Sequence, residues 1–212
     1  MILYTVKNGV YYNLEDFRQD LSDLGENGFP NKIYINMTNR CSCACTFCLR
    51  SLKEFNEHNS LWLREEPTVD EVKAEFEKYD WSHVAEIIFC GFGEPTMRLD
   101  DMVEVGAWLK SVHPEIPIRV NTNGLSDLVF EKPTAQCLQG IVDTVSISLN
   151  SSDAQKYVDI TRNHFGLKSY QKYVPNVVMT VVDIIGEEEV AACRKVCDDN
   201  GLFLRVRPYE AN

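Results

Sequence analysis

The sequence predicts an α/β fold, an open partial (β/α)6 barrel of the TIM-like type that is preceded by a β-hairpin. The first observation is a series of short segments rich in Val, Ile, Thr and aromatic residues, the pattern of buried strands. Six of these segments read as the strands of the barrel: 33–37, 86–89, 116–121, 144–149, 177–184 and 203–206. The second observation is that helical patterns lie between them, which predicts parallel strands with right-handed crossovers. Because a closed barrel of this type needs eight units, six units predict a curved, open sheet.

Four segments carry helical patterns. Segment 68–79 opens with Thr68 and Glu71 in the spacing of a capping box. Segment 99–113 has helical apolar spacing and stops before Pro114, and segment 187–200 is followed by Gly201 as a C-cap. Segment 152–160 supplies a crossover helix before the fifth strand, although the connection 166–175 that follows it is short.

The first residues of the chain predict a hairpin. Segments 2–6 and 10–14 have strand character, and the residues between them, Lys7-Asn8-Gly9, are typical of a tight turn. We therefore expect residues 1–29 to form an N-terminal hairpin extension and residues 30–212 to form the barrel, as one structural domain.

Composition and charge exclude several classes of protein. The chain has 212 residues, 44% of them hydrophobic, which is typical of a globular domain. The net charge of −11 and the lack of a Lys/Arg stripe argue against DNA as a partner, although Arg162, Arg205 and Arg207 could converge into a local basic pocket. Apolar runs such as 141–149 and 176–185 are too short to cross a bilayer, and no secretory leader opens the chain, so a cytoplasmic location is expected.

Four of the eight cysteines fall in one short segment, at positions 41, 43, 45 and 48. Cys41, Cys45 and Cys48 form the spacing Cys-x3-Cys-x2-Cys directly after the first barrel strand. Three thiolates from one loop can hold three irons of a 4Fe-4S cluster and leave the fourth iron open. The aromatic ring of Phe47 would shield such a cluster from water.

Structural zinc is the alternative for this loop. A structural zinc site takes four closed ligands, commonly from two Cys-x2-Cys pairs, and no second pair exists here. Cys43 breaks the three-then-two spacing, so we interpret it as a bystander.

The cysteine loop with Phe47 resembles the defining motif of the radical S-adenosylmethionine (radical SAM) superfamily. Other segments resemble the TatD-associated radical SAM subfamily, whose name reflects genomic association with TatD-type hydrolases. These segments are 34–41, 89–95, 121–124, 146–150 and 203–207.

The resemblance implies roles for residues at the ends of the strands. Gly91, Gly93 and Glu94 would receive the amino group of S-adenosylmethionine, because a backbone carbonyl and a carboxylate accept hydrogen bonds from an ammonium. The short polar side chains that would contact its ribose and carboxylate are Asn121, Asn123, Ser148 and Asn150. Candidates for contact with the substrate are Cys90, Arg162 and Arg207.

The resemblance also implies the chemistry. A 4Fe-4S cluster would reductively cleave S-adenosylmethionine, and the resulting 5'-deoxyadenosyl radical would abstract hydrogen from an unidentified small-molecule or peptide substrate. A flavodoxin or ferredoxin would supply the electron, and a TatD-type hydrolase is an expected functional partner. The alternative is an iron-sulfur electron-transfer or sensor protein, in which Cys43, Cys90 or His83 supplies a fourth ligand.

Overall fold

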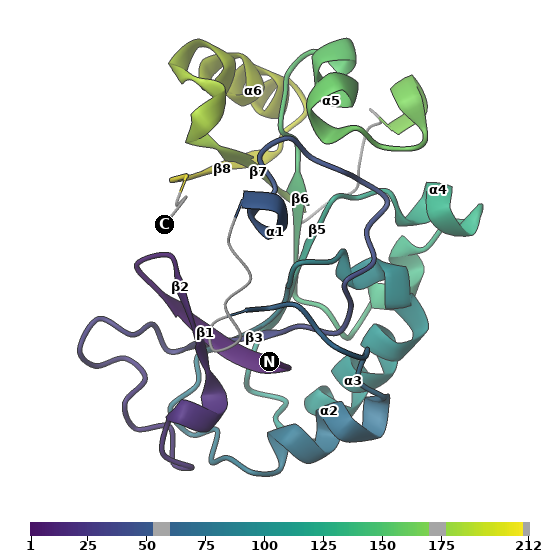
Figure 1. Cartoon of the computed structure of the whole chain (residues 1–212). Helices are drawn as coiled ribbons and strands as arrows, with labels where there is room; N and C mark the ends of the chain where they lie inside the picture. Colours follow the sequence, from purple (N-terminus) through teal and green to yellow (C-terminus); the bar gives the residue numbers. More distant parts are fainter. Residues whose placement is uncertain (53–59, 170–176, 210–212) are drawn as a thin grey trace.

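The computed structural model describes residues 1–52, 60–169 and 177–209. Its centre is one eight-stranded sheet in the order β2-β1-β3-β4-β5-β6-β7-β8 (Figure 1). The strands are β1 (Leu3–Lys7), β2 (Val10–Asn13), β3 (Lys32–Ile35), β4 (Glu86–Phe89), β5 (Ile118–Thr122), β6 (Thr144–Ser148), β7 (Val177–Val182) and β8 (Phe203–Arg207). Strands β3 to β8 are all parallel, as the sequence predicted. Within the described residues β2 and β8 are unpaired on their outer sides, so the sheet stays open.

The predicted hairpin is confirmed, and it belongs to the same sheet. Its two-residue turn is Asn8-Gly9, with φ of 50° and 74°, the positive values that tight hairpin turns require. Strand β1 also pairs antiparallel with β3, placing Tyr4 opposite Tyr34. Leu3 and Leu14 are buried in the largest core cluster, so the hairpin shares its core with the parallel strands.

The helices occupy the crossovers. The longer ones are α2 (Val69–Phe76), α3 (Leu99–Val112), α5 (Ala154–Thr161) and α6 (Glu187–Asp199). The shorter ones are α1 (Leu49–Leu52), α4 (Ser126–Phe130) and the 3-10 turns η1 (Leu14–Asp16), η2 (Pro95–Arg98), η3 (Ala135–Leu138), η4 (Gly166–Ser169) and η5 (Asp183–Ile185). The Thr68–Glu71 capping box is present. Helix α2 ends at Phe76, three residues earlier than predicted. The Phe76 carbonyl there accepts hydrogen bonds from the indole of Trp81 (2.9 Å) and the amide of Tyr79 (3.3 Å).

The two faces of the sheet have different chemistry. Side chains alternate along each strand, and one set packs against α2 and α3 in the main core. From β3, β4 and β5 this set is Ile33, Ile35, Ile87, Phe89, Ile118 and Val120. The alternate positions on the opposite face include Tyr34, Arg119 and Asn121, which line a pocket. The face opposite α2 and α3 therefore carries polar side chains among aromatic ones, and it holds the candidate site with α1 at its border.

Two further expectations meet the structure here. No helix among the described residues is long and apolar enough to cross a membrane. The predicted short connection 166–175 lies mostly outside the described residues. Its described part, residues 166–169, forms η4.

Candidate active site

The cysteine loop runs from the end of β3 to α1 and crosses the carboxyl ends of the parallel strands (Figure 1). Two backbone hydrogen bonds fix its middle to the end of α5, from Ala44 N to the Thr161 carbonyl (2.9 Å) and from Thr46 N to the Ile160 carbonyl (2.9 Å). The guanidinium of Arg50 closes the loop by donating to the carbonyls of Asn39 (3.2 Å) and Cys43 (3.3 Å). The loop is thus held by main-chain contacts, which leaves its thiols free for ligation.

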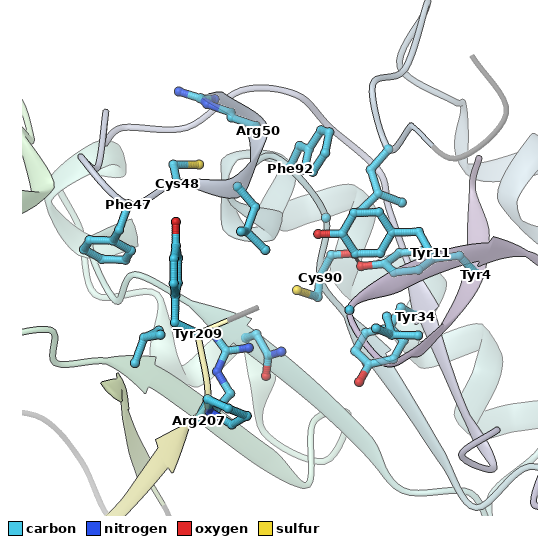
Figure 2. Close-up of a pocket in the computed structure, with 18 of the residues that line it drawn as sticks. Tyr4, Tyr11, Tyr34, Phe47, Cys48, Arg50, Cys90, Phe92, Arg207 and Tyr209 are labelled. Carbon is cyan, nitrogen blue, oxygen red and sulfur yellow. Dashed lines mark hydrogen bonds between the residues drawn. The ribbon is translucent and has the colours of Figure 1, made fainter. Parts of the chain in front are cut away.

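The thiols of Cys41 and Cys43 lie near each other. The Cys43 amide donates to the Cys41 Sγ (3.4 Å), and Asn123 Nδ2 approaches the Sγ atoms of Cys43 (3.6 Å) and Cys41 (3.9 Å). A hydrogen bond between the Cys41 and Cys43 thiols, together with burial, raises the pKa of Cys41 far above its usual range. The side chain of Cys43, predicted to be a bystander, therefore lies among the side chains of the predicted ligands. The Cys48 thiol faces the adjoining pocket (Figure 2).

The donor chemistry of the loop fits an iron-sulfur cluster. Soft thiolates are the ligands that iron-sulfur clusters take, and all four thiols belong to one eight-residue segment. In the parts of the chain that the structure describes, no three His, Cys, Asp or Glu side chains converge closely enough to hold a metal ion as they stand.

The glycine turn after β4 packs directly against the cysteine loop. A Cβ atom at Gly93 would lie 2.2 Å from the Thr38 carbonyl oxygen and 2.7 Å from that of Arg40. At Gly91 it would lie 2.0 Å from Oδ1 of Asn36. Only glycine permits this approach, and the amide of Glu94 then donates to the Arg40 carbonyl (2.8 Å).

Glu94 is buried at the centre of the site and is 5% exposed. Its Oε1 accepts hydrogen bonds from the amide and hydroxyl of Thr96 and from the hydroxyl of Thr122 (2.7 Å). Its Oε2 accepts from the amide of Asn123 (2.7 Å). Burial raises the pKa of Glu94 although these hydrogen bonds oppose the shift. The carboxylate thus ties the glycine turn to the end of β5, and Oε2, with a single donor, retains acceptor capacity.

The predicted polar residues at strand ends divide into two groups. Asn123 donates to Ser42 Oγ (3.1 Å) and so reaches the cysteine loop, while Asn121 lines the pocket. The Asn121 Oδ1 is buried and has no hydrogen-bond partner among the residues described. Ser148 ends β6, and Asn150 follows it with a φ of 60°, but neither lines the pocket.

The pocket has a volume of about 380 Å³ and spans the curled sheet from β1 to β8. One wall is aromatic: the rings of Tyr4 and Tyr34 stack with centroids 5.1 Å apart, and Tyr11 packs edge-on against Phe92 at 5.9 Å. Phe47 lines the pocket beside Cys48, and its shielding role stays a prediction.

The opposite part of the lining is basic. Arg119 of β5 and Arg205 and Arg207 of β8 meet here, and Arg119 also lies 3.4 Å from Glu86. Burial lowers the pKa of Arg205, and the neighbouring charges of Arg119 and Arg207 lower it further. The predicted convergence of Arg205 and Arg207 is therefore present, but its third member is Arg119. Arg162 instead caps the C-terminus of α5, exposed and outside the pocket lining.

Cys90 follows β4 and contributes to the same lining. Its thiol points into the pocket (Figure 2), and its carbonyl accepts a hydrogen bond from the Tyr4 hydroxyl (3.1 Å). Neither Tyr4 nor Arg119 was predicted from the sequence. The only available signal was the alternation of polar and apolar residues in the strands that carry them.

Comparison with known proteins gives two findings. Residues 35–189 match the family model of the Radical SAM superfamily. The chain is 31% identical over 138 residues to a GTP 3',8-cyclase of Corynebacterium glutamicum strain R, an alignment that covers 60% of this chain and 33% of that protein. A GTP 3',8-cyclase of Paenarthrobacter nicotinovorans is 26% identical over 143 residues, covering 62% of this chain and 35% of the relative. The chain thus spans about a third of the length of these curated relatives.

Proposed function

Because the chain belongs to the radical SAM superfamily, enzymes with a 4Fe-4S cluster and S-adenosylmethionine as cofactors, we propose that it abstracts a hydrogen atom from a substrate bound in the arginine-lined pocket. The observation that carries this proposal is the position of the pocket. It borders the cysteine loop at Phe47 and Cys48, and the glycine turn at Gly91. A radical formed at the loop would therefore meet a substrate without crossing solvent.

Cys41, Cys45 and Cys48 are the residues proposed to hold the cluster. When bound, the reduced cluster supplies the electron that splits S-adenosylmethionine into methionine and a 5'-deoxyadenosyl radical. Glu94 Oε2 and a carbonyl near Gly93 would accept the methionine ammonium, since both lie against the cysteine loop.

Other residues of the chain would orient the cofactor and the substrate. Asn121 and Asn123 are supported as cofactor contacts by the unpartnered Oδ1 of Asn121 and by the reach of Asn123 to the loop. Ser148 and Asn150 lie outside the pocket lining, and the family resemblance alone supports them as cofactor contacts. For the substrate, we propose contacts with Cys90 and Arg207.

The wider context of the enzyme is also a proposal. The segments that resemble the TatD-associated subfamily support a functional link to a TatD-type hydrolase, and a flavodoxin or ferredoxin would serve as reductant. We propose the cytoplasm as the compartment, since cluster thiols must stay reduced.

GTP cyclisation is a second candidate function. It is suggested by the GTP 3',8-cyclases, and the observation in its favour is the pocket that combines arginines with an aromatic wall. Anaerobic incubation of the reconstituted protein with S-adenosylmethionine, dithionite and GTP tests it. Unchanged GTP alongside continued formation of 5'-deoxyadenosine would remove this candidate.

Uncoupled cleavage of the cofactor is the test of the main proposal. The anaerobically reconstituted and dithionite-reduced protein is expected to convert S-adenosylmethionine to 5'-deoxyadenosine and methionine without added substrate, and chromatography measures both products. A full cluster that yields no 5'-deoxyadenosine, with no cofactor binding in calorimetry, would contradict the proposal.

Single cysteine substitutions test the ligand assignment. Cys41→Ala, Cys45→Ala and Cys48→Ala are each expected to lose most of the iron and all of the cleavage activity, because each removes one of three ligands. Cys43→Ala is the matched control from the same loop and is expected to keep about four irons per chain. The assignment is wrong if Cys43→Ala loses the cluster while one of the other three variants keeps it.

A further inference from the structure

We propose that Arg119, Arg205 and Arg207 form a binding site for a dianionic phosphate ester, and that the substrate carries this group next to a planar ring. The inference rests on the proposed function, because it identifies the chemical class of the substrate in the same pocket. It goes beyond the proposed substrate contact with Arg207, since it places an anion between three guanidinium groups.

The first support is a cluster of three guanidinium groups with only one carboxylate beside it. The side chain of Arg119 is 8% exposed, and its Nε has no hydrogen-bond partner among the residues described. Arg205 is half-buried, and neither it nor Arg207 forms an ion pair within the described parts of the chain. Arg207 is exposed, so the cost of burial falls on Arg119 and Arg205, and an anion between the three guanidinium groups would offset both this cost and their mutual repulsion.

The second support is the charge balance. Three guanidinium groups face one carboxylate, Glu86, which lies 3.4 Å from Arg119 and also pairs with Lys32 at 3.0 Å. With Lys32 counted, four cations surround one carboxylate and about three positive charges remain, so a phosphate monoester of charge about −2 at pH 7 compensates most of them. A single carboxylate would leave about two charges uncompensated. Guanidinium groups also suit phosphate oxygens because they donate two parallel hydrogen bonds.

The third support is the neutral donor and the stacked rings opposite the arginines. The charges of Arg119, Arg205 and Arg207 all reach Tyr34, whose hydroxyl has no hydrogen-bond partner in the described chain. Burial nevertheless raises the pKa of Tyr34, so the hydroxyl stays protonated and can donate to an anion. Tyr34 stacks on Tyr4, and these rings form an apolar wall beside the arginines (Figure 2). A substrate with a planar ring next to its phosphate would use both surfaces.

The carboxylate of S-adenosylmethionine is the competing occupant of the three-arginine site. The two occupants differ in a measurable way. If the site belongs to the cofactor, substitution of its arginines weakens binding of S-adenosylmethionine and uncoupled cleavage. If the site belongs to the substrate, both survive and only binding of the phosphate ester is lost.

Phenyl phosphate is the probe, because it joins a dianionic phosphate to one planar ring. Calorimetry of the reconstituted holoprotein saturated with S-adenosylmethionine should show phenyl phosphate binding at least about tenfold more tightly than benzoate, a monoanion of similar size, or inorganic phosphate, which lacks the ring. Binding of phenyl phosphate should weaken as salt is raised.

Arg205→Gln and Arg207→Gln are expected to weaken phenyl phosphate binding by about tenfold or more each, with unchanged iron content and uncoupled cleavage. Arg119→Lys tests the most buried of the three arginines and keeps its positive charge, which lowers the risk to folding. It is also expected to weaken phenyl phosphate binding, because lysine cannot donate two parallel hydrogen bonds. The matched control is Arg194→Gln on α6, an exposed arginine that makes the same charge change and should bind like the wild type.

The outcomes separate this inference from the proposed function. Phenyl phosphate that binds no better than benzoate, that binds equally well to all variants, or that is displaced by S-adenosylmethionine would overturn the phosphate site while uncoupled cleavage still stood. Tight, arginine-dependent binding by a protein that cannot cleave S-adenosylmethionine would leave the site intact and remove the proposed reaction.

Discussion

Single backbone atoms set the geometry next to the cysteine loop. The carbonyl oxygens of Thr38 and Arg40 occupy the space in which a side chain at Gly93 would begin. The contact is with backbone, which cannot rotate away as a long side chain can. Gly93 therefore controls the distance between the loop that carries the cysteines and the turn that carries Glu94.

Gly93→Ala is expected to reduce iron content and to destabilise the protein by about 1–3 kcal/mol, the usual cost of overpacking. Iron analysis after reconstitution and urea unfolding measure the two effects. The control is Gly140→Ala, which carries the strain of a φ of 75° but would place its Cβ more than 4 Å from any neighbour. Equal loss of iron in the two variants would mean that general strain, and not the contact with the cysteine loop, is responsible.

At the scale of elements, helix α6 is joined to α5 and the end of β6 by one carboxylate. Glu189, in the first turn of α6, accepts hydrogen bonds from the amide and hydroxyl of Ser152, the hydroxyl of Ser151 and the ammonium of Lys156. The hydrogen bond from Lys156 is the main cause that lowers the pKa of Glu189 from 4.5 to about 2. This contact aligns α5, whose last residues hold the cysteine loop.

Glu189→Gln is expected to lower the free energy of unfolding at pH 7 by about 1–2 kcal/mol, less than the full shift implies because Lys156 is partly exposed to solvent. The pKa is lower in the folded state, so the stabilisation is complete above about pH 5 and is lost as the pH falls from about 4.5 toward about 2. Urea unfolding at pH 7 and at pH 4 measures the difference.

Glu188→Gln, an exposed neighbour in the same turn, is the control and should change stability by less than about 0.5 kcal/mol at either pH. A difference between Glu189→Gln and wild type that is identical at pH 7 and pH 4 would show that charge plays no part.

At the scale of the whole molecule, the curvature of the sheet determines which residues share the pocket. The sheet is open, yet Tyr4 and Tyr34 near one edge line the same pocket as Arg205 and Arg207 on the opposite edge strand. The hairpin contributes to this arrangement and also to the main core, through Leu3 and Leu14. We propose that residues 1–29, expected to be an extension, fold together with the rest of the chain as one cooperative unit.

Deletion of residues 1–29 tests this proposal. The truncated chain is expected to lose cooperative unfolding and cluster binding, because it loses buried leucines and leaves β3 with a free edge. Leu14→Ala, a milder change at a fully buried position, is expected to cost about 2–5 kcal/mol. Circular dichroism during urea unfolding and iron analysis give the results. A truncated chain with an unchanged midpoint and a full cluster would establish the hairpin as an independent extension.

Local patterns in the sequence accounted for much of the fold. The six parallel strands, the hairpin with its Asn8-Gly9 turn and the Thr68 capping box were predicted because each depends on residues a few positions apart. The spacing of the cysteines was enough to identify the superfamily for the same reason, because the cysteines of the motif lie in one loop. Helix and strand ends were less accurate, as at Phe76, where a side chain from the following turn competes for the last carbonyl.

The sequence by itself thus determined the fold class, the superfamily and the loop that carries the cysteines. Tertiary structure alone decided which distant residues share the pocket: it brought Arg119 to Arg205 and Arg207, set Tyr4 beside Cys90 and left Arg162 outside. It also gave Glu94 its hydrogen bonds to Thr122 and Asn123. The physical reason is that spacing along the chain fixes period and turn geometry, whereas the curvature of a sheet depends on strand twist and on packing between segments far apart in sequence.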